Sequence, residues 1–324
     1  MRRFGIALLL LLASCTPAAP APPSTASRQS AAEADATLAS LRRVDDLPLY
    51  EMTYTGDYDV SAPGPSPTAT APFGCSLFAA LGDPDHPLFG RNFDWDPNPA
   101  LVLRTDPPDG YASISLVDLR YLGLTAADDP AGDRRLLDAP LLPFDGLNER
   151  GLAVGMAADE GASATPDPAK PTVGSVRILR LVLDAAATVD EALAIFDRYN
   201  IDFVGGPPLH YLLADASGTS ALVEFADGRR QVERGTGRWQ ALTNVPLIGV
   251  GEHERRQDTR YRVLADTLGR TGGTVTEIDA MSLLRAVAQP ITRWSATYDL
   301  GTGQLRVVTG RRWQTVHAFR LAVS

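Results

Sequence analysis

The chain of 324 residues is poor in cysteine, histidine and basic residues, and each shortage excludes a class of protein. Two cysteines allow at most one disulfide, which excludes a scaffold held together by several disulfides. The four histidines lack the spacing of metal ligands, and H-E-x-x-H is missing. With 30 basic and 39 acidic residues the net charge is −9, which argues against a nucleic-acid partner.

Several motifs of cofactor and active sites are also missing. No G-x-G-x-x-G follows a strand pattern and no Walker loop occurs, so nucleotide binding lacks support. The absence of G-x-S-x-G removes the simplest serine hydrolase. The segment that starts at Asp94 begins like a calcium loop, but Pro99 replaces the required glycine and Thr105 the required glutamate. We therefore expect neither a metal ion nor a cofactor.

The first residues have the composition of an export signal. Two arginines precede an apolar run from Phe4 to Ala13, about half the roughly 20 residues that span a bilayer. The run leads into L-A-S-C, which ends at Cys15 and resembles the lipobox of bacterial lipoproteins, where a cysteine is lipidated after cleavage. We expect a signal peptide over 1–14 and an exported protein anchored to the cell envelope through Cys15. An ordinary secretory signal that contains a cysteine is the alternative.

Composition divides the rest of the chain into a tether, a pro-segment and a main domain. Residues 15–31 are rich in proline, alanine and serine, which have little to pack, and form the tether. The pro-segment, residues 32–74, shows a helical pattern up to Val44, an extended stretch from Leu49 and a second proline-rich stretch. We expect it to pack against a main domain over 75–324.

The main domain alternates strand patterns with two pairs of helices. Strand-like runs begin at Ser76, Tyr111, Leu152, His210, Ser220, Arg238, Trp294 and Val316. The helical patterns cover 175–187 and 188–200, the second opened by a capping box at Thr188, and 252–268 and 276–289. This order predicts an α+β fold in which helices cover antiparallel sheets.

Cys75 is the candidate nucleophile. Cleavage of the peptide bond after Gly74 would give Cys75 a free α-amine beside its thiol. A reference α-amine titrates at about 8 and a cysteine thiol at about 8.5, so the amine can act as the local base without a histidine. The alternative is a buried cysteine that serves only as a small apolar residue.

Six short motifs follow one another across the main domain. They are G-C-S-L at 74–77, G-R-N-F-D-W at 90–95, D-G-L-N-E-R-G-L at 145–152, A-D-A-S-G…V-E at 214–224, G-R-W…L-T-N at 237–244 and E-R-R at 254–256. Through this ordered set the chain resembles the N-terminal-nucleophile (Ntn) hydrolases of the choloylglycine hydrolase superfamily, which includes bile-salt hydrolases, penicillin V acylases, acid ceramidase and N-acylethanolamine acid amidases. The resemblance implies a four-layer αββα sandwich of two stacked antiparallel sheets.

Residues near Cys75 in the sequence would support its chemistry. Arg91 would favour the thiolate by placing positive charge beside it, and Asp94 would orient the ammonium group. Residues three apart face opposite sides of a straight strand, so both reach Cys75 only if the strand ends or bulges near Phe93. Asn92 is a candidate supporting residue.

The resemblance also implies roles for later residues. It places the side-chain amide of Asn244 in an oxyanion hole, with a backbone N–H near Ala158 as second donor. It makes Arg255 the late catalytic arginine, with Arg256 as the competing register. The alternatives are a turn residue before Pro246 for Asn244 and a solvated helix charge for Arg255.

Three further residues complete the candidate site. Glu149 resembles the glutamate that supports the site and self-cleavage in the ceramidase branch, with Asn148 beside it; the alternative for Glu149 is a turn before Gly151. Trp95 is expected to line the substrate pocket, as is Arg256.

The sequence therefore predicts an exported, self-cleaving cysteine amidase. Cys75 would attack the carbonyl of a linear N-acyl amide, and water would release the acid from a thioester. The resemblance implies an apolar acyl chain, because members of this superfamily mostly accept fatty, aromatic or steroid acyl groups. The pro-segment would remain bound as a noncovalent subunit, as in the ceramidase and acid amidase branch. The lipidated Cys15 would anchor the protein to the membrane. The alternatives are an acyltransferase, in which an amine takes the acyl group, and a lipid-binding envelope lipoprotein without turnover.

Overall fold

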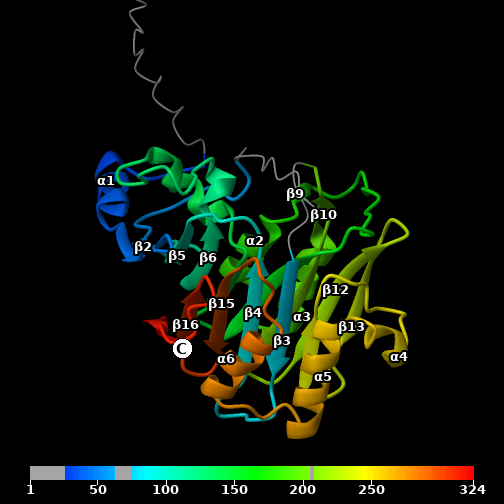
Figure 1. Cartoon of the computed structure of the whole chain (residues 1–324). Helices are drawn as coiled ribbons and strands as arrows, with labels where there is room; N and C mark the ends of the chain where they lie inside the picture. Colours follow the sequence, from blue (N-terminus) through cyan, green and yellow to red (C-terminus); the bar gives the residue numbers. More distant parts are fainter. Residues whose placement is uncertain (1–25, 63–73, 205–207) are drawn as a thin grey trace, which may run out of the picture.

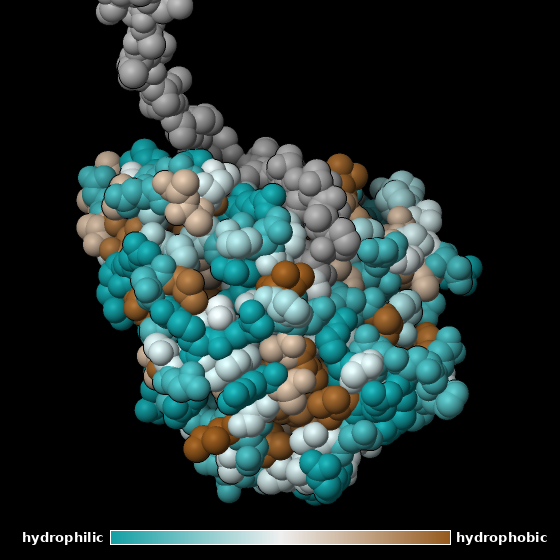
Figure 2. Space-filling model, viewed as in Figure 1, coloured by the Kyte–Doolittle hydropathy of each residue, from teal (hydrophilic) through white to brown (hydrophobic). Residues whose placement is uncertain are grey.

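The computed structural model describes residues 26–62, 74–204 and 208–324 (Figure 1). The predicted signal peptide, Cys15, and most of the tether and of the second proline-rich stretch lie outside these residues. Within the described ranges, no helix is both long enough and apolar enough to cross a membrane. The face seen in Figure 2 is mainly hydrophilic, with apolar side chains in small scattered patches, as is usual for a protein surface.

Two stacked sheets form the centre of the molecule (Figure 1). The larger contains, in spatial order, β1 (Arg42–Asp45), β2 (Leu49–Thr53), β5 (Ala100–Thr105), β6 (Ser113–Asp118), β7 (Asp145–Asn148), β8 (Leu152–Ala158), β11 (Leu209–Asp215), β12 (Ser220–Ala226) and β13 (Arg229–Arg234). The smaller contains β14 (Trp239–Leu242), β3 (Gly74–Ala80), β4 (Leu88–Asp94), β15 (Thr292–Asp299), β16 (Gln304–Thr309) and β17 (His317–Arg320). A separate parallel pair joins β9 (Thr172–Gly174) to β10 (Asn200–Asp202).

Helices cover both outer faces and complete the four layers. On the larger sheet, α2 (Ile178–Ala185) packs on β7 and β8, and α3 (Val189–Arg198) packs on β11. On the smaller sheet, α5 (Thr259–Thr271) packs on β14 and β3, and α6 (Glu277–Ala286) on β4 and β15. The short elements are α4 (Glu252–Arg255) and the 3₁₀ helices η1 (Leu119–Leu122) and η2 (Arg134–Leu141). The predicted α+β class and stacked, largely antiparallel sheets are confirmed, with the parallel β2–β5 pair as an exception.

The helix boundaries follow from capping residues. Thr188 accepts a hydrogen bond from the N–H of Glu191 and so begins α3, as predicted. The Glu191 carboxylate, however, accepts from the N–H of Ala187 rather than closing the box on Thr188. The predicted single helix over 252–268 is wrong, because Asp258 caps the N-terminus of α5 and separates it from α4.

The predicted pro-segment adds two strands to the edge of the larger sheet. Its helix α1 (Ala31–Ala39) ends before Val44, so the prediction of a helix to Val44 is wrong there, and β1 takes that position. β2 then pairs with β5 of the main domain over five residue pairs. Tyr54 and Tyr58 are buried, with 2% and 4% of their surface exposed. The pro-segment is therefore part of the hydrophobic core.

A close approach of the two sheets fixes the depth of the candidate nucleophile. β3 of the smaller sheet lies against β8 of the larger one. At Gly155 on β8 a Cβ atom would lie 2.6 Å from Leu77 Cδ2 on β3, which is too close for any other residue without rearrangement. Cys75, two residues before Leu77, is consequently enclosed between the sheets with none of its surface exposed.

Candidate active site

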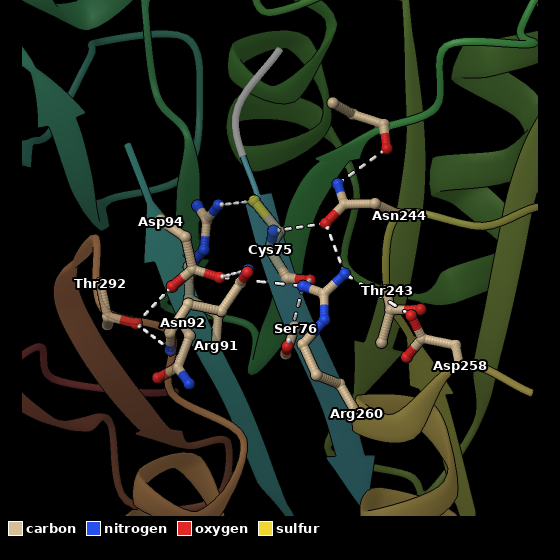
Figure 3. A network of polar contacts seen from close by, with 12 residues as sticks. Cys75, Ser76, Arg91, Asn92, Asp94, Thr243, Asn244, Asp258, Arg260 and Thr292 are labelled. Atoms are coloured by element: carbon tan, nitrogen blue, oxygen red, sulfur yellow. Dashed lines mark hydrogen bonds and ion pairs between the residues drawn. The ribbon is translucent and has the colours of Figure 1, made fainter. Parts of the chain in front are cut away.

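Arg91 and Cys75 meet across neighbouring antiparallel strands. On β3 and β4, Cys75 is opposite Phe93, and Leu77 is opposite Arg91. Cross-strand partners share a face of the sheet, so Arg91 and Cys75 are diagonal neighbours on one face. Arg91 Nη2 lies 2.9 Å from Cys75 Sγ. Figure 3 shows the guanidinium directed at the sulfur atom. The structure thus places the predicted arginine at the sulfur atom.

A carboxylate that the sequence analysis did not assign holds Arg91. Nη1 of Arg91 lies 2.6 Å from Asp145 Oδ2, and neither side chain has any exposed surface. The same guanidinium donates to the main-chain oxygens of Phe144 at 3.1 Å and Met156 at 3.3 Å. Burial opposes the charge on Arg91, but Cys75 and Asp145 outweigh burial and raise the Arg91 pKa. Asp145 lies in the D-G-L-N motif. The feature of the sequence that could have identified it is the position of a charged residue directly after the apolar segment L-L-P-F.

Burial dominates the ionisation of the thiol in this uncut chain. Burial raises the pKa of Cys75 to about 11, Arg91 lowers it, and Asp94 raises it. Arg91 thus favours the thiolate, as expected, but in the uncut chain its effect is smaller than that of burial. A reactive thiolate therefore requires either a nearby base or a change in solvation.

Asp94 approaches from the other face of the smaller sheet. Its carboxylate accepts hydrogen bonds from Thr292 Oγ1 at 2.5 Å and Gln289 Nε2 at 2.6 Å. β4 ends at Asp94, and the register irregularity lies in the neighbouring strand β15, between Thr292 and Trp294. Asp94 pairs in register with Gly74, where a Cβ would lie 2.5 Å from Gln289 Nε2. Asp94 is thus beside the bond before Cys75, whereas Arg91 is at the sulfur.

Asn244 binds the main chain of Cys75 (Figure 3). Its Oδ1 accepts from the Cys75 N–H at 2.7 Å, and its Nδ2 donates to the Ala158 carbonyl oxygen at 2.8 Å. The structure brings Asn244 and Ala158 together, but this contact uses the Ala158 carbonyl. The predicted donor role of a backbone N–H near Ala158 stays a prediction.

Arg260, rather than Arg255 or Arg256, is the arginine of this segment that contacts Cys75. Arg260 Nη1 donates to the Cys75 carbonyl oxygen at 2.6 Å, and Nη2 donates to Asn244 Oδ1 at 3.0 Å. Nη1 also lies 3.8 Å from Asp94 Oδ2. Figure 3 shows Arg260 reaching from α5 toward the start of β3.

The assignments of Arg255 and Arg256 are corrected accordingly. Arg255 makes two hydrogen bonds to Glu233 of β13, at 2.9 and 2.6 Å. Arg256 pairs with Glu252 at 2.6 Å and also with Asp266. The cause is the break between α4 and α5, which changes the direction in which successive arginines of this segment point.

Asn92, Asn148 and Glu149 have contacts elsewhere in the described part of the chain. Asn92 donates to the Leu284 carbonyl oxygen of α6 at 2.8 Å. Asn148 donates to the Ala186 carbonyl oxygen at 2.7 Å and so ties β7 to the end of α2. Glu149 Oε1 accepts from the Ala112 N–H at 3.2 Å. The turn alternative for Glu149 fits these contacts.

Trp95 belongs to an aromatic cluster that continues from Phe93. The ring centroids of Phe93 and Trp95 are 6.0 Å apart, and those of Trp95 and Tyr121 are 5.8 Å apart. Tyr121 in turn packs edge-on against Phe144 at 4.8 Å. Because Phe93 is opposite Cys75 in the sheet, this cluster gives the candidate site an apolar surround.

The described residues do not offer a metal centre. Among them, no group of three or more histidine, cysteine, aspartate or glutamate side chains is placed to hold a metal ion. The chemistry that the site can perform with its own groups is nucleophilic attack by sulfur, with charge stabilisation by the surrounding amide and guanidinium groups.

Comparison with known proteins supports the same interpretation. The fold resembles two variants of a conjugated bile acid hydrolase from Clostridium perfringens, with TM-scores of 0.58 and 0.60 at 16% and 17% identity; each match covers 76% of this chain and 92% of the other. It also resembles a penicillin V acylase from Agrobacterium tumefaciens, with a TM-score of 0.54 at 19% identity, covering 76% and 86%.

In sequence, a penicillin V acylase of Pectobacterium atrosepticum is 30% identical over 192 residues, which cover 54% of this chain and 50% of that protein. The chain therefore spans about half the length of this curated relative. The model of the linear amide C-N hydrolases, choloylglycine hydrolase family, matches residues 75–247, more than half of the chain. The chain belongs to the choloylglycine hydrolase family of linear amide C-N hydrolases.

Proposed function

We propose that this protein is a self-activating cysteine amidase that hydrolyses linear N-acyl amides through a thioester on Cys75. One observation carries the proposal: Arg91 at the sulfur and Asn244 at the main-chain nitrogen converge on one residue, at 2.9 and 2.7 Å. That residue is also the first one matched by the family model. A cysteine that served only as core packing would not need two charged or amide groups directed at it.

Self-cleavage is the first step of the proposal. Cys75 Sγ attacks the Gly74 carbonyl carbon, the Gly74–Cys75 C–N bond breaks, and the nitrogen takes a proton to become an amine. Water then hydrolyses the thioester, which leaves a Gly74 carboxylate and a free thiol. Arg260 holds the Cys75 carbonyl oxygen at 2.6 Å, and Asp94 lies on the Gly74 side, so both stay beside the new amine.

Substrate hydrolysis repeats the same bond changes on an external amide. The α-amine takes the thiol proton, sulfur attacks the substrate carbonyl, and the amine passes the proton to the leaving nitrogen. Water releases the acid and regenerates the thiol. Asn244 is the candidate donor to the oxyanion through Nδ2, which in this structure donates to the Ala158 carbonyl oxygen while Oδ1 accepts from the Cys75 nitrogen.

We further propose an apolar acyl group for the substrate. The aromatic cluster of Phe93, Trp95, Tyr121 and Phe144 begins opposite Cys75 and has few polar atoms to offer. The relatives are named penicillin V acylase and conjugated bile acid hydrolase. An aromatic or other extended apolar acyl group would bury its surface against these rings.

The pro-segment is proposed to remain bound after cleavage, and Cys15 to anchor the exported protein to a membrane. The β2–β5 pairing supplies main-chain hydrogen bonds, and Tyr58 donates to Asp184 of α2 at 2.8 Å. Burial raises the Tyr58 pKa, so the phenol stays a donor. A cut protein that eluted as two separate chains in size-exclusion chromatography would refute retention.

A panel of N-acyl amides tests the substrate class. Acyl chains of graded length and aromatic content are supplied, and the released amine is quantified for the wild type and Cys75→Ala. Amine release that requires Cys75 and increases with apolar acyl size is expected. Transfer to an added amine in place of hydrolysis would indicate the acyltransferase, and binding of the amides without amine release would indicate the lipid-binding protein.

A further inference from the structure

A buried polar cluster contacts the main chain before and after Asn244. It consists of His210 on β11, Glu224 on β12, Asp159 after β8, and Thr243, the residue before Asn244. Between 0% and 4% of the surface of each of these four residues is exposed. Buried polar groups are costly unless their hydrogen bonds are satisfied, so the partners of each group identify what the cluster holds.

Glu224 holds the segment that follows Asn244. Its Oε1 accepts from the N–H of Leu247 and its Oε2 from the N–H of Ile248, each at 2.9 Å. Burial raises the Glu224 pKa, but the contacts with His210, Ile248 and Leu247 outweigh burial and lower it. Both carboxylate oxygens therefore act as acceptors, and residues three and four positions beyond Asn244 are fixed to β12.

His210 holds the residue on the other side of Asn244. Its Nε2 lies 2.7 Å from the Thr243 carbonyl oxygen, and a carbonyl oxygen can only accept, so Nε2 carries a proton. Its Nδ1 lies 3.3 Å from Glu224 Oε1 and 3.9 Å from Asp159 Oδ2. An unprotonated Nδ1 would direct a lone pair at two carboxylates, whereas a proton on Nδ1 would let the ring donate to Glu224.

The cluster also reaches the partner of the Asn244 amide. Asn244 Nδ2 donates to the Ala158 carbonyl oxygen, and Ala158 is paired with Leu209, next to His210, in the β8–β11 ladder. His210 thus lies between the two segments that Asn244 connects. His210 and Glu224 thus contact the residues before and after Asn244, and the acceptor of its amide, Ala158, precedes Asp159, whose Oδ2 lies 3.9 Å from His210 Nδ1.

We propose that His210 and Glu224 form a buried imidazolium–carboxylate clamp that positions Asn244 for catalysis. The clamp rests on the proposed function, because it acts through the oxyanion role of Asn244. It sets the direction of the Asn244 amide, while the reacting atoms touch neither His210 nor Glu224. A displacement of about 1 Å at such a group typically costs on the order of 100-fold in rate.

Nuclear magnetic resonance of the wild-type protein tests the charge state without any substrate. With ¹⁵N-labelled histidine, His210 should show protons on both ring nitrogens, and Glu224→Gln should remove the proton from Nδ1. A wild-type Nδ1 with the shift of an unprotonated nitrogen would overturn the imidazolium clamp.

Kinetics and the Asn244 signal test positioning. In Glu224→Gln and His210→Gln we expect kcat to fall by about 10–100-fold with KM nearly unchanged, and the side-chain amide resonance of Asn244 to shift. His86→Gln is the matched control, because His86 also pairs with a carboxylate, Asp299 at 2.9 Å, but is 58% exposed. His86→Gln should have the wild-type kcat and the wild-type side-chain amide resonance of Asn244.

Two outcomes separate failure of the clamp from failure of the proposed function. Folded Glu224→Gln and His210→Gln proteins with wild-type Asn244 resonances would overturn the clamp. A wild type that hydrolyses no amide, while the Asn244 resonance still shifts in both variants, would refute the proposed function and support the positioning. If the variants do not fold, the charge state of His210 in the wild type decides the clamp.

Discussion

Arg91 joins Asp145 to Cys75 inside the molecule, with Nη1 2.6 Å from Asp145 and Nη2 2.9 Å from the sulfur. Asp145 is held in turn by the hydroxyl of Tyr298, which donates to its other oxygen. The guanidinium therefore has one anionic partner that is present in the folded protein and one, the thiolate, that forms during the reaction. Asp145 balances the buried charge until the thiolate appears.

Asp145→Asn should strongly destabilise the protein. It leaves Arg91 charged and buried without its carboxylate, which typically costs about 3–5 kcal/mol of unfolding free energy. The double variant Arg91→Met/Asp145→Leu removes both charges and should recover most of that loss, yet remain inactive. Urea unfolding measures the free energies, and equal stabilities of Asp145→Asn and the wild type would contradict this role.

Thiol reactivity before cleavage should depend steeply on pH. Because burial raises the pKa of Cys75 to about 11, the thiolate fraction of the uncut chain should rise about tenfold per pH unit from pH 7 to pH 10. Since Arg91 lowers this pKa, Arg91→Met should react more slowly at each pH. Iodoacetamide labelling followed by intact mass separates the uncut chain from the cut one. A rate that levels off below pH 9 would disagree with the buried geometry.

Arg260, and not its neighbours, should affect turnover. Arg260→Met removes the donors to the Cys75 carbonyl and to Asn244, so we expect a loss of about 10–100-fold in kcat/KM. Arg255→Met and Arg256→Met serve as controls, because their partners are Glu233 and Glu252. If Arg255→Met lost as much activity as Arg260→Met, the site would extend further than the contacts indicate.

Asp118, which lies outside the candidate active site, should make the stability of the protein depend on pH. Burial raises its pKa to about 7, which the Arg120 N–H and Asn98 only partly oppose. Because the folded pKa exceeds the unfolded value of about 3.9, the folded state binds the proton more tightly. The contribution of Asp118 to the free energy of unfolding is therefore fully present below pH 4 and is lost as the pH rises from 4 to about 7. The loss is up to about 1.4 kcal/mol per pH unit.

Asp118→Asn tests this assignment. The variant cannot ionise, so its unfolding free energy should fall less than that of the wild type between pH 4 and 7. Unfolding curves at each pH measure the difference, and parallel pH profiles for the two proteins would assign the slope to other groups.

The sequence was most informative where a motif fixes its own geometry. G-C-S-L and G-R-N-F-D-W are separated in sequence by the length of a β-hairpin. Antiparallel pairing of their two strands therefore brings Arg91 to Cys75. The alternation of strand patterns with two helical pairs likewise predicted antiparallel sheets covered by helices, because each amphipathic helix needs a sheet face to cover, whereas the stacking of two sheets was implied by the family resemblance.

Residues whose position depends on tertiary packing were not predictable in the same way. The segment E-H-E-R-R-Q-D-T-R-Y-R contains four arginines, and only the helix break at Asp258 decides that Arg260 faces Cys75. The residues around Asp145 indicate only a polar residue in a short strand. Its partner Arg91 lies 54 positions away in the sequence. The helix predicted to Val44 fails because pairing with β2 outweighs a weak helical pattern.

The most direct test is the intact mass of the purified chain without its predicted signal peptide, beside Cys75→Ala, at neutral and acidic pH. The account predicts that the wild type yields a fragment of 250 residues that begins at Cys75, while the variant stays uncut. Cleavage of Cys75→Ala at the same bond, or a wild type that stays uncut at both pH values, would contradict a nucleophile generated by self-cleavage.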